Sequence, residues 1–188
     1  MSKKEIARNA VKALKKEYPD ALCSLDYKDP WQLLVATRLA AQCTDARVNL
    51  VTPALFKKYP TLEDYCNAEI EDIENIIHSC GFYRAKAKDI KGIALMIRDE
   101  FNGKVPDSIE KLTSLPGVGR KSANLIMGDV FGEPAIVTDT HCIRLVNRMG
   151  LVDGFTEPKK VEMALWKIIP PEEGNDFCHR LVYHGRAV

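Results

Sequence analysis

The 188-residue sequence predicts an all-α fold, and two observations support this prediction. Apolar residues recur three and four positions apart along most of the chain, as they do on the buried face of a helix. Runs of alternating β-branched residues, which would indicate strands, are nearly absent. Capping and helix-ending residues separate the apolar runs, so each helix can be placed in turn.

Capping residues indicate where the first helices begin. The amino-terminal segment is interpreted as an amphipathic helix whose core-facing residues are Ile6, Val11 and Leu14. Asp29-Pro30 is expected to open a helix that runs through Leu39, because proline is favoured at the first helical position. Thr44 or Asp45 can cap the next helix, which continues to Tyr59.

The remaining helices follow from similar signals. Thr61 begins a short helix with Glu63 in part of a capping pattern, and Asn102-Gly103 ends a longer helix. Pro106-Asp107-Ser108 opens the next one, and Phe82 lies in a turn. Helices are therefore expected over residues 70–77, 84–101, 109–115, 121–131, 139–149, 158–169 and 172–184.

The composition indicates a protein without a membrane partner. No run approaches the roughly 20 apolar residues that span a bilayer, and the amino end lacks the apolar core of a signal peptide, so a cytoplasmic location is expected. The formal net charge is only +1, so attraction to nucleic acid requires local basic clusters. Taken singly, each candidate cluster is better explained as a solvated helix face. The candidates are Arg84 with Lys86, Lys88 and Lys91, then Arg120 with Lys121, and Arg144 with Arg148.

The six cysteines are scattered and include no Cys-x-x-Cys pair. This pattern predicts neither a disulfide framework nor a zinc site, and no metal site is expected. Buried free thiols in a reducing compartment fit the pattern better. The cysteines are Cys23, Cys43, Cys66, Cys80, Cys142 and Cys178.

The most informative stretch is residues 116–120, Pro-Gly-Val-Gly-Arg, between two predicted helices. Two glycines one residue apart allow a tight hairpin, expose backbone N–H groups and aim the amino end of the following helix outward. Such a hairpin can bind a DNA phosphate without reading base sequence. A plain helix-helix turn is the alternative that Gly-x-Gly alone favours.

Lys121 follows this hairpin in the first turn of the next predicted helix. The helix dipole and neighbouring Arg120 both disfavour the ammonium form, and a neutral amine is a nucleophile. Attack on C1′ of a deoxyribose would expel the base and leave a Schiff base, and elimination would then cut the strand. An ordinary phosphate-contacting lysine is the alternative that position alone favours.

Asp139 lies 18 residues further on, after a short apolar run and at the start of another predicted helix. It can simply cap that helix. It can also stabilise the positive charge that develops on the sugar and help to remove the proton of the lysine. The two roles are compatible.

Together these segments resemble the endonuclease III family of the helix-hairpin-helix DNA glycosylase superfamily. The resemblance rests on residues 115–124, LPGVGRKSAN, followed by residues 137–141, VTDTH. It extends over residues 39–45, LAAQCTD, over residues 81–87, GFYRAKA, and over residues 184–186, HGR. A lysine and an aspartate at this spacing, next to a helix-hairpin-helix, make the resemblance specific.

The resemblance implies a two-lobed all-α fold with a DNA-binding cleft between the lobes. A six-helix barrel is expected over residues 24–135, and a second lobe over residues 1–23 and 136–188. The implied activity is that of a bifunctional DNA N-glycosylase and abasic-site (AP) lyase of base excision repair. Its substrates would be oxidised pyrimidines flipped out of damaged double-stranded DNA. A monomer is expected, because nothing indicates a coiled-coil seam.

The resemblance also implies roles for single residues. Lys121 is implied to be the Schiff-base nucleophile and Asp139 the essential acid. Gln42 matches the residue that fills the hole left by the flipped nucleotide, and Phe82 lies where the family places an apolar wedge. Each of the latter two has a structural alternative, a helix-end glutamine in water and a buried helix-connecting aromatic. The implied phosphate-binding residues are Leu115, Gly117, Val118, Gly119 and Arg120.

The chain departs from the family pattern in its cysteines. Members usually continue after the His-Gly-Arg segment into a loop with the pattern Cys-x6-Cys-x2-Cys-x5-Cys, which holds a 4Fe-4S cluster. No four of the six cysteines reproduce that spacing. The chain as given is therefore expected to bind no cluster, although the full-length family does.

Two other functions remain open. A non-catalytic helix-hairpin-helix DNA-binding module would use the hairpin only to hold phosphate, and it would have no use for Asp139. An adenine-mismatch glycosylase of the same superfamily would need no nucleophilic lysine, so Lys121 argues against it. That branch also places a glutamate in the segment that corresponds to residues 33–37, LLVAT, which contain none.

Overall fold

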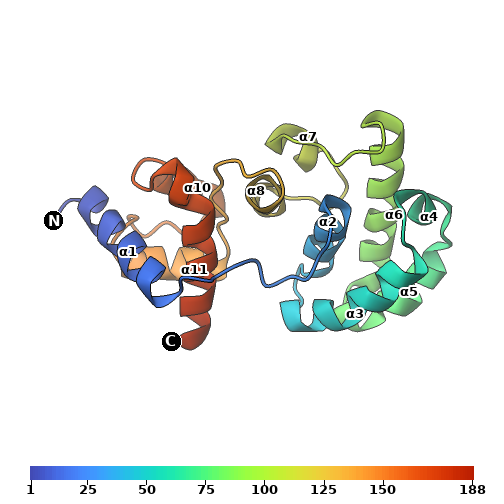
Figure 1. Ribbon diagram of the computed structural model, residues 1–188, viewed down its shortest axis with the longest axis horizontal. Coiled ribbons are helices and arrows are strands. Elements are labelled where there is room, and N and C mark those ends of the chain that lie inside the picture. The colour runs from blue at the N-terminus through green and yellow to red at the C-terminus, as the bar shows by residue number, and fades with distance from the viewer. The chain divides into compact units, whose positions relative to one another are not determined.

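The computed structural model describes residues 1–188 (Figure 1). It contains eleven α-helices, two short 3-10 helices and no strand, which confirms the predicted all-α fold. The chain divides into two compact units, one of residues 24–126 and one of residues 1–23 with 127–188. None of the helices combines the length and the apolar character that crossing a bilayer requires.

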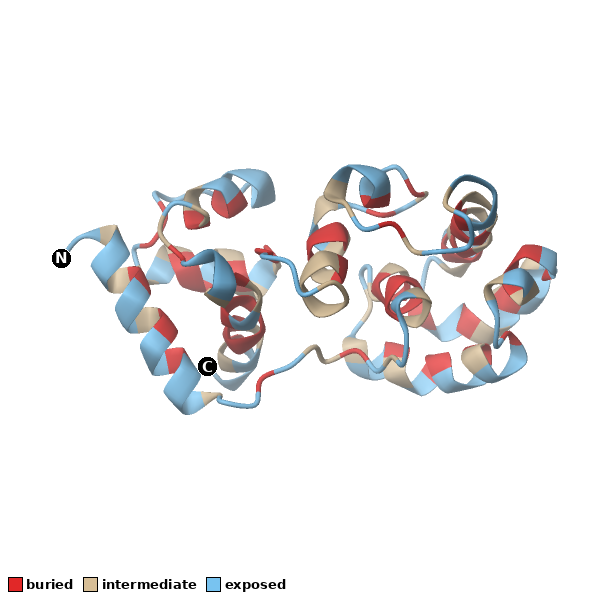
Figure 2. Ribbon diagram, turned by 45° about the horizontal axis from the view of Figure 1, so that its top comes forward, coloured by how far each residue is buried: buried red, intermediate tan, exposed pale blue.

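The unit of residues 24–126 is built around α6, its longest helix. Helix α6 packs against α4 and α5, and its buried face carries isoleucines at three- and four-residue spacing. Figure 2 shows buried residues recurring along one side of the helices. The helices are α2 (Pro30–Leu39), α3 (Asp45–Lys58), α4 (Leu62–Asn67), α5 (Ile70–Ile77), η1 (His78–Cys80), α6 (Tyr83–Glu100), α7 (Ile109–Thr113) and the part of α8 (Arg120–Asp129) up to Ile126.

Side-chain caps begin these helices where the sequence predicts them. Asp29, Thr44 and Ser108 each accept a hydrogen bond from the backbone N–H three residues on, at 2.9, 3.2 and 3.3 Å. The capping partner of Thr61 is Asp64 and not Glu63, because a capping box uses the third helical residue, and the Thr61 N–H donates to Asp64 Oδ2 at 2.8 Å.

The second unit consists of the two ends of the chain. Helix α11 packs against both α9 and α1 (Figure 1). Lys15 pairs with Glu173 at 3.0 Å, and the Tyr18 hydroxyl and His184 Nδ1 form a hydrogen bond of 3.1 Å, so α1 is tied to the carboxyl-terminal part of the chain. The helices are α1 (Lys3–Glu17), α9 (Thr140–Arg148), α10 (Pro158–Leu165), η2 (Pro171–Glu173) and α11 (Gly174–Ala187).

The chain passes from one unit to the other between Ile126 and Met127, inside α8. The lobe boundary expected after residue 135 lies beyond the end of this helix. The six-helix barrel and the cleft implied by the family resemblance stay predictions.

Helices α7 and α10 end before their expected last residues, because turns follow Thr113 and Leu165.

Candidate active site

The predicted hairpin lies between α7 and α8. The Leu115 N–H donates to the Leu112 carbonyl and the Val118 N–H donates to the Leu115 carbonyl, both at 3.2 Å. The side chains of Leu115 and Val118 are buried, whereas Gly119 is exposed. Two apolar anchors therefore hold the hairpin, and its tip faces solvent.

An ion pair between Arg38 and Asp89 packs against the hairpin at Gly117. Arg38 donates to Asp89 Oδ2 from Nε at 2.8 Å and from Nη2 at 2.7 Å. A Cβ at Gly117 would collide with both of these side chains, and the φ of Gly117 is +68°. Space and backbone conformation therefore both favour glycine here. At Gly119 an added Cβ would meet open space.

Lys121 is exposed in the first turn of α8, directly after the hairpin. The first four backbone N–H groups of a helix have no partner within it, so the amino end of α8 offers hydrogen-bond donors and partial positive charge to an anion. The Ala123 N–H donates back to the Gly119 carbonyl at 3.0 Å and begins the regular helical pattern. The hairpin and Lys121 thus form one exposed feature that can hold an anion beside a primary amine.

Asp139 is the N-cap of α9. Its Oδ1 accepts a hydrogen bond from the Cys142 N–H at 2.7 Å, which confirms the predicted capping role. The residue is half-buried, and residues 135–138 before it are buried. Lys121 and Asp139 belong to different units, and the catalytic role of each stays a prediction.

Gln42 and Phe82 share an unusual backbone conformation. Both are exposed, and both lie in the left-handed region, with φ of +53° and +46°. Phe82 has 67% of its surface exposed, so it is not a buried helix-connecting aromatic. Its apolar ring is presented to solvent directly before α6. The DNA contacts expected of both residues stay predictions.

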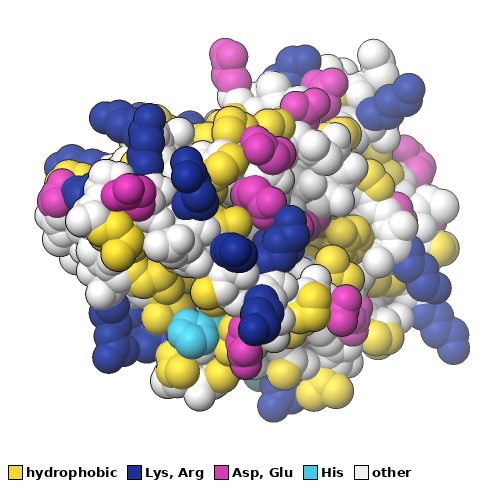
Figure 3. All heavy atoms as spheres, turned by 60° about the vertical axis from the view of Figure 1, so that its left-hand side comes forward, with side chains coloured by type: hydrophobic (Ala, Val, Ile, Leu, Met, Phe, Trp, Pro, Cys, Tyr) yellow, Lys and Arg dark blue, Asp and Glu magenta, His cyan; other side chains and the backbone are white.

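The basic cluster expected around α6 is only partly on the surface. Arg84 and Lys88 are exposed, but Lys86 is fully buried and Lys91 donates to the Ala68 carbonyl at 2.6 Å. The sequence does contain a signal for the burial of Lys86, because this residue lies four and seven positions before two buried isoleucines of the same helix face, Ile90 and Ile93. On the face shown in Figure 3, basic and acidic side chains are interspersed, in keeping with the net charge of +1.

Comparison with known proteins identifies the family. A family described as "HhH-GPD superfamily base excision DNA repair protein" matches residues 35–171. Endonuclease III of Synechocystis sp. is 50% identical over 188 residues, which cover all of this chain and 85% of that protein. Endonuclease III of Bacillus subtilis is 43% identical over 169 residues, 90% of this chain and 77% of that protein. The chain belongs to the endonuclease III family.

Solved structures agree with this assignment. The structure of a trapped endonuclease III-DNA covalent intermediate has a TM-score of 0.94 and 43% identity, and the match covers 100% of this chain and 87% of that chain. A thermostable thymine-DNA glycosylase, 20% identical with a TM-score of 0.83, shares the fold. The helix-hairpin-helix DNA glycosylase fold is confirmed, and the function of the chain is that of a base-excision DNA glycosylase and AP lyase.

The cysteines of this endonuclease III family member do not form a cluster site. The family carries an iron-sulfur cluster. Here no group of three His, Cys, Asp or Glu side chains could hold a metal ion, and the residues present therefore do not fit a four-cysteine cluster. Cys142 and Cys178 form a thiol pair whose hydrogen bond, together with burial, holds the pKa of Cys142 well above its usual value. Burial and the nearby Cys43 thiol raise the pKa of Cys80 to about 11.

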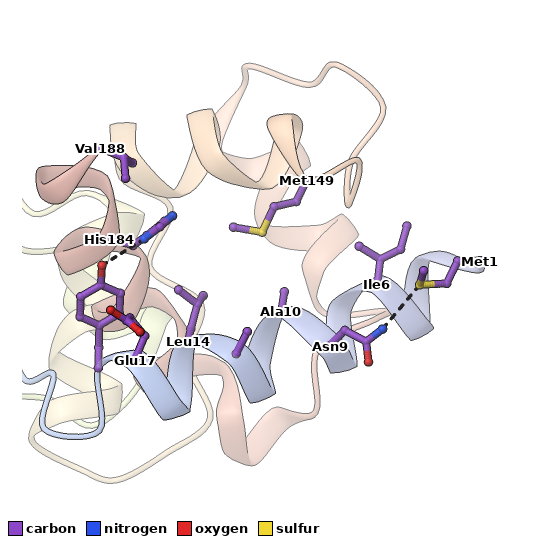
Figure 4. A pocket seen from close by; sticks show the side chains of 11 residues that line it. Met1, Ile6, Asn9, Ala10, Leu14, Glu17, Met149, His184 and Val188 are labelled. Atoms are coloured by element: carbon purple, nitrogen blue, oxygen red, sulfur yellow. Dashed lines mark hydrogen bonds between the residues drawn. The ribbon is translucent and has the colours of Figure 1, made fainter.

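A pocket of about 780 Å³ lies in the unit formed by the chain ends (Figure 4). Ile6, Ala10 and Leu14 line it from α1, and Met149 and Val188 line it from the carboxyl-terminal half. Figure 4 shows His184 at one end of the pocket, and its Nδ1 forms the hydrogen bond with the Tyr18 hydroxyl. None of the predicted site residues lines this mainly apolar pocket, so it is separate from the expected chemistry.

Proposed function

We propose that the chain removes oxidised pyrimidines from damaged double-stranded DNA and cuts the strand through a Schiff base on Lys121. The observation that carries this proposal is the exposed amine of Lys121, which directly follows the hairpin in a chain that is 50% identical to an endonuclease III. The trapped covalent intermediate of a 43% identical endonuclease III with DNA supports covalent chemistry. The neutral amine is the form of lysine that acts as the nucleophile in this chemistry.

The proposed reaction begins when the lone pair of Lys121 Nζ attacks C1′ of the flipped nucleotide. The bond between C1′ and the base breaks, its electron pair leaves with the base, and the base takes up a proton. The sugar ring then opens to give an iminium ion, loss of a proton from C2′ follows, and the bond between C3′ and oxygen breaks. This elimination cuts the strand on the 3′ side of the lesion and requires no cofactor.

Asp139 is proposed to supply the carboxylate that this reaction needs. A carboxylate stabilises the positive charge that develops at C1′ and accepts the proton that the attacking amine must lose. Oδ1 is used by the cap of α9, so Oδ2 is the oxygen assigned to the reaction. The capping bond also fixes the rotamer of the side chain, because one oxygen is held at the helix end.

The hairpin is proposed to grip a phosphate next to the lesion. Gly119 is exposed and has no Cβ, so a phosphate oxygen can approach the backbone N–H groups at the start of α8. Leu115 and Val118 anchor the loop, and Arg120 adds positive charge. Such contacts carry no base information, which suits an enzyme that must act in any sequence context.

Gln42 and Phe82 are proposed to stabilise the opened duplex. Flipping a nucleotide costs stacking and pairing energy of a few kcal/mol. A polar side chain that occupies the vacated position and an apolar ring that wedges into the stack offset this cost. The exposure of both residues supports these roles.

We further propose that residues 1–188 act as a monomer and bind no iron-sulfur cluster. The lack of any grouping of three His, Cys, Asp or Glu side chains supports the second part. Iron analysis of anaerobically purified protein checks the cluster, and sedimentation velocity checks the oligomeric state. Stoichiometric iron, or a stable dimer at micromolar concentration, would contradict the respective expectation.

Borohydride trapping tests the proposed chemistry. Duplex DNA with one abasic site is incubated with the protein, and borohydride then reduces any imine to a stable covalent link. A protein-DNA band is expected for the wild type and for Lys104→Ala, which removes an exposed lysine from the turn after α6. No band is expected for Lys121→Ala.

Each contrary outcome points to a different function. DNA binding without a band in the wild type would indicate a non-catalytic DNA-binding module. Release of mispaired adenine without a band would indicate an adenine-mismatch glycosylase. A band that survives in Lys121→Ala would place the nucleophile elsewhere.

A further inference from the structure

Lys86 is a lysine in the hydrophobic core of residues 24–126. Its side chain has 0% of its surface exposed, and Nζ donates to the Leu39 carbonyl at 2.8 Å and to the Cys80 carbonyl at 3.0 Å. Taking an ammonium group out of water is costly unless it is hydrogen-bonded, and burial lowers the pKa of Lys86. A methionine would fill similar volume without this cost. Packing alone therefore does not explain the amine.

The two acceptor carbonyls lie at the ends of helices. Leu39 is the last residue of α2, and Cys80 is the last residue of η1. Carbonyl groups in a last helical turn have no partner within the helix, so each can accept a hydrogen bond from a side chain. Each carbonyl is followed within three residues by an exposed residue in the left-handed region. Gln42 follows Leu39, and Phe82 follows Cys80.

The left-handed conformation requires support from the surrounding structure. The only other non-glycine residue with positive φ is Asn102, of a type that tolerates this region. A phenylalanine or glutamine there persists only where neighbouring contacts hold the backbone. The Lys86 ammonium supplies one such contact to each loop.

We propose that Lys86 is a positioning residue that sets the two loops carrying Gln42 and Phe82 so that both side chains are presented to the duplex together. This inference rests on the proposed function, in which the two side chains stabilise the flipped-out state. Because both carbonyls bind one nitrogen, neither loop can move away from the other without breaking a hydrogen bond. The two hydrogen bonds of Lys86 thus fix the relative placement of the two loops, which must contact the same lesion.

The same helix provides a matched control. Lys91 is half-buried on α6, and its Nζ donates to one carbonyl, that of Ala68 between α4 and α5. No predicted site residue lies next to Ala68 in the sequence. Lys91→Met therefore removes a comparable lysine-carbonyl contact without releasing either loop.

The test compares abasic DNA as a duplex and as a single strand of the same sequence. A single strand needs neither a hole-filling residue nor a wedge, so its cleavage reports the chemistry without the contributions of Gln42 and Phe82. We expect Lys86→Met to lower the ratio of duplex to single-strand cleavage rates by roughly ten- to hundredfold. We expect Lys91→Met to leave this ratio unchanged. Adding Phe82→Ala to Lys86→Met should lower the ratio little further, because both changes affect the same step.

Several outcomes would overturn the inference. An unchanged ratio in Lys86→Met, or an equal fall in Lys91→Met, would show that Lys86 serves stability alone. If Lys86→Met does not fold, Lys86→Leu also removes the bridging ammonium group, and an unchanged ratio in that variant overturns the inference equally. Failure of the wild type to cut or trap either substrate would refute the proposed function and this inference with it. Normal wild-type chemistry with no effect of Lys86→Met refutes the inference alone.

Discussion

At the residue scale, Asp139 uses one carboxylate oxygen to cap α9, and the other oxygen is available for chemistry. Oδ1 accepts the Cys142 N–H at 2.7 Å. An asparagine provides the same capping oxygen without the negative charge, whereas an alanine provides neither. The structural and chemical contributions of this side chain can therefore be separated by two substitutions.

We predict that Asp139→Asn keeps the stability of the wild type to within about 0.5 kcal/mol, and that Asp139→Ala loses about 1 kcal/mol with the cap. Both variants should lower the single-turnover lyase rate by roughly 10²- to 10⁴-fold, because neither carries a carboxylate. Denaturant unfolding and single-turnover cleavage of abasic DNA measure the two effects.

Asp29 provides the control for this prediction. It caps α2 through the same kind of bond, from the Gln32 N–H at 2.9 Å. Asp29→Asn should change neither stability nor lyase rate appreciably. An Asp139→Asn variant with the wild-type rate would remove Asp139 from the reaction and leave it a structural cap.

At the element scale, the two glycines of the hairpin have different tasks. Gly117 lies against the Arg38–Asp89 pair with φ of +68°, whereas an added Cβ at Gly119 meets nothing. Gly117 therefore serves the packing of the hairpin on α2 and α6. Gly119 leaves room at the exposed tip.

Alanine at each glycine should reveal this difference. We predict that Gly117→Ala lowers the free energy of unfolding by about 1–3 kcal/mol, because it adds backbone strain and a steric clash. Gly119→Ala should unfold like the wild type but bind abasic duplex DNA more weakly, because its methyl group keeps phosphate away from the backbone N–H groups. Thermal unfolding and fluorescence anisotropy measure the two quantities. Unchanged DNA affinity in Gly119→Ala would show that phosphate does not approach the tip.

At the scale of the whole molecule, the thiols report which parts of the chain exclude solvent. Four cysteines are buried, and two, Cys23 and Cys43, are half-buried. The reactive form of cysteine is the thiolate, and a raised pKa keeps Cys80 and Cys142 protonated near neutral pH. We predict that iodoacetamide at about pH 8 labels Cys23 and Cys43 first in the folded protein.

Peptide mapping by mass spectrometry checks this labelling order. Cys66, Cys80, Cys142 and Cys178 should react only after denaturation, and a denatured sample is the control for their intrinsic reactivity. Rapid modification of Cys142 or Cys178 in the folded protein would mean that the end of the chain opens readily and exposes α11.

The sequence predicts the helices well because the signals for helix starts are local. Asp29, Thr44 and Ser108 cap helices through bonds to residues only three positions away. The hairpin and Lys121 are predictable for the same reason, since glycine spacing and the following helix lie within a few residues. The predicted capping partner of Thr61, Glu63, is wrong by one position, because the structure pairs Thr61 with Asp64.

Long-range partners are the part that sequence alone does not predict. The sequence pattern groups Lys86 with surface cations, but its burial depends on a carbonyl 47 positions away in the sequence. The Arg38–Asp89 pair beneath the hairpin joins residues 51 positions apart. Such contacts depend on how the helices pack, and charged side chains are rarely buried without partners of this kind.

Because one of the two units combines both ends of the sequence, helices that pack together in it are synthesised at different times. Helix α1 packs against α11, yet Gly174 lies 157 positions after Glu17 in the sequence. At about 5–20 residues per second, α1 waits roughly 8 to 30 s for this partner, while residues 24–126 are already complete and able to fold as a unit. Six lysine and arginine side chains on α1 help to keep its apolar face soluble during that delay. Helix α1 is thus synthesised well before the helix that it packs against.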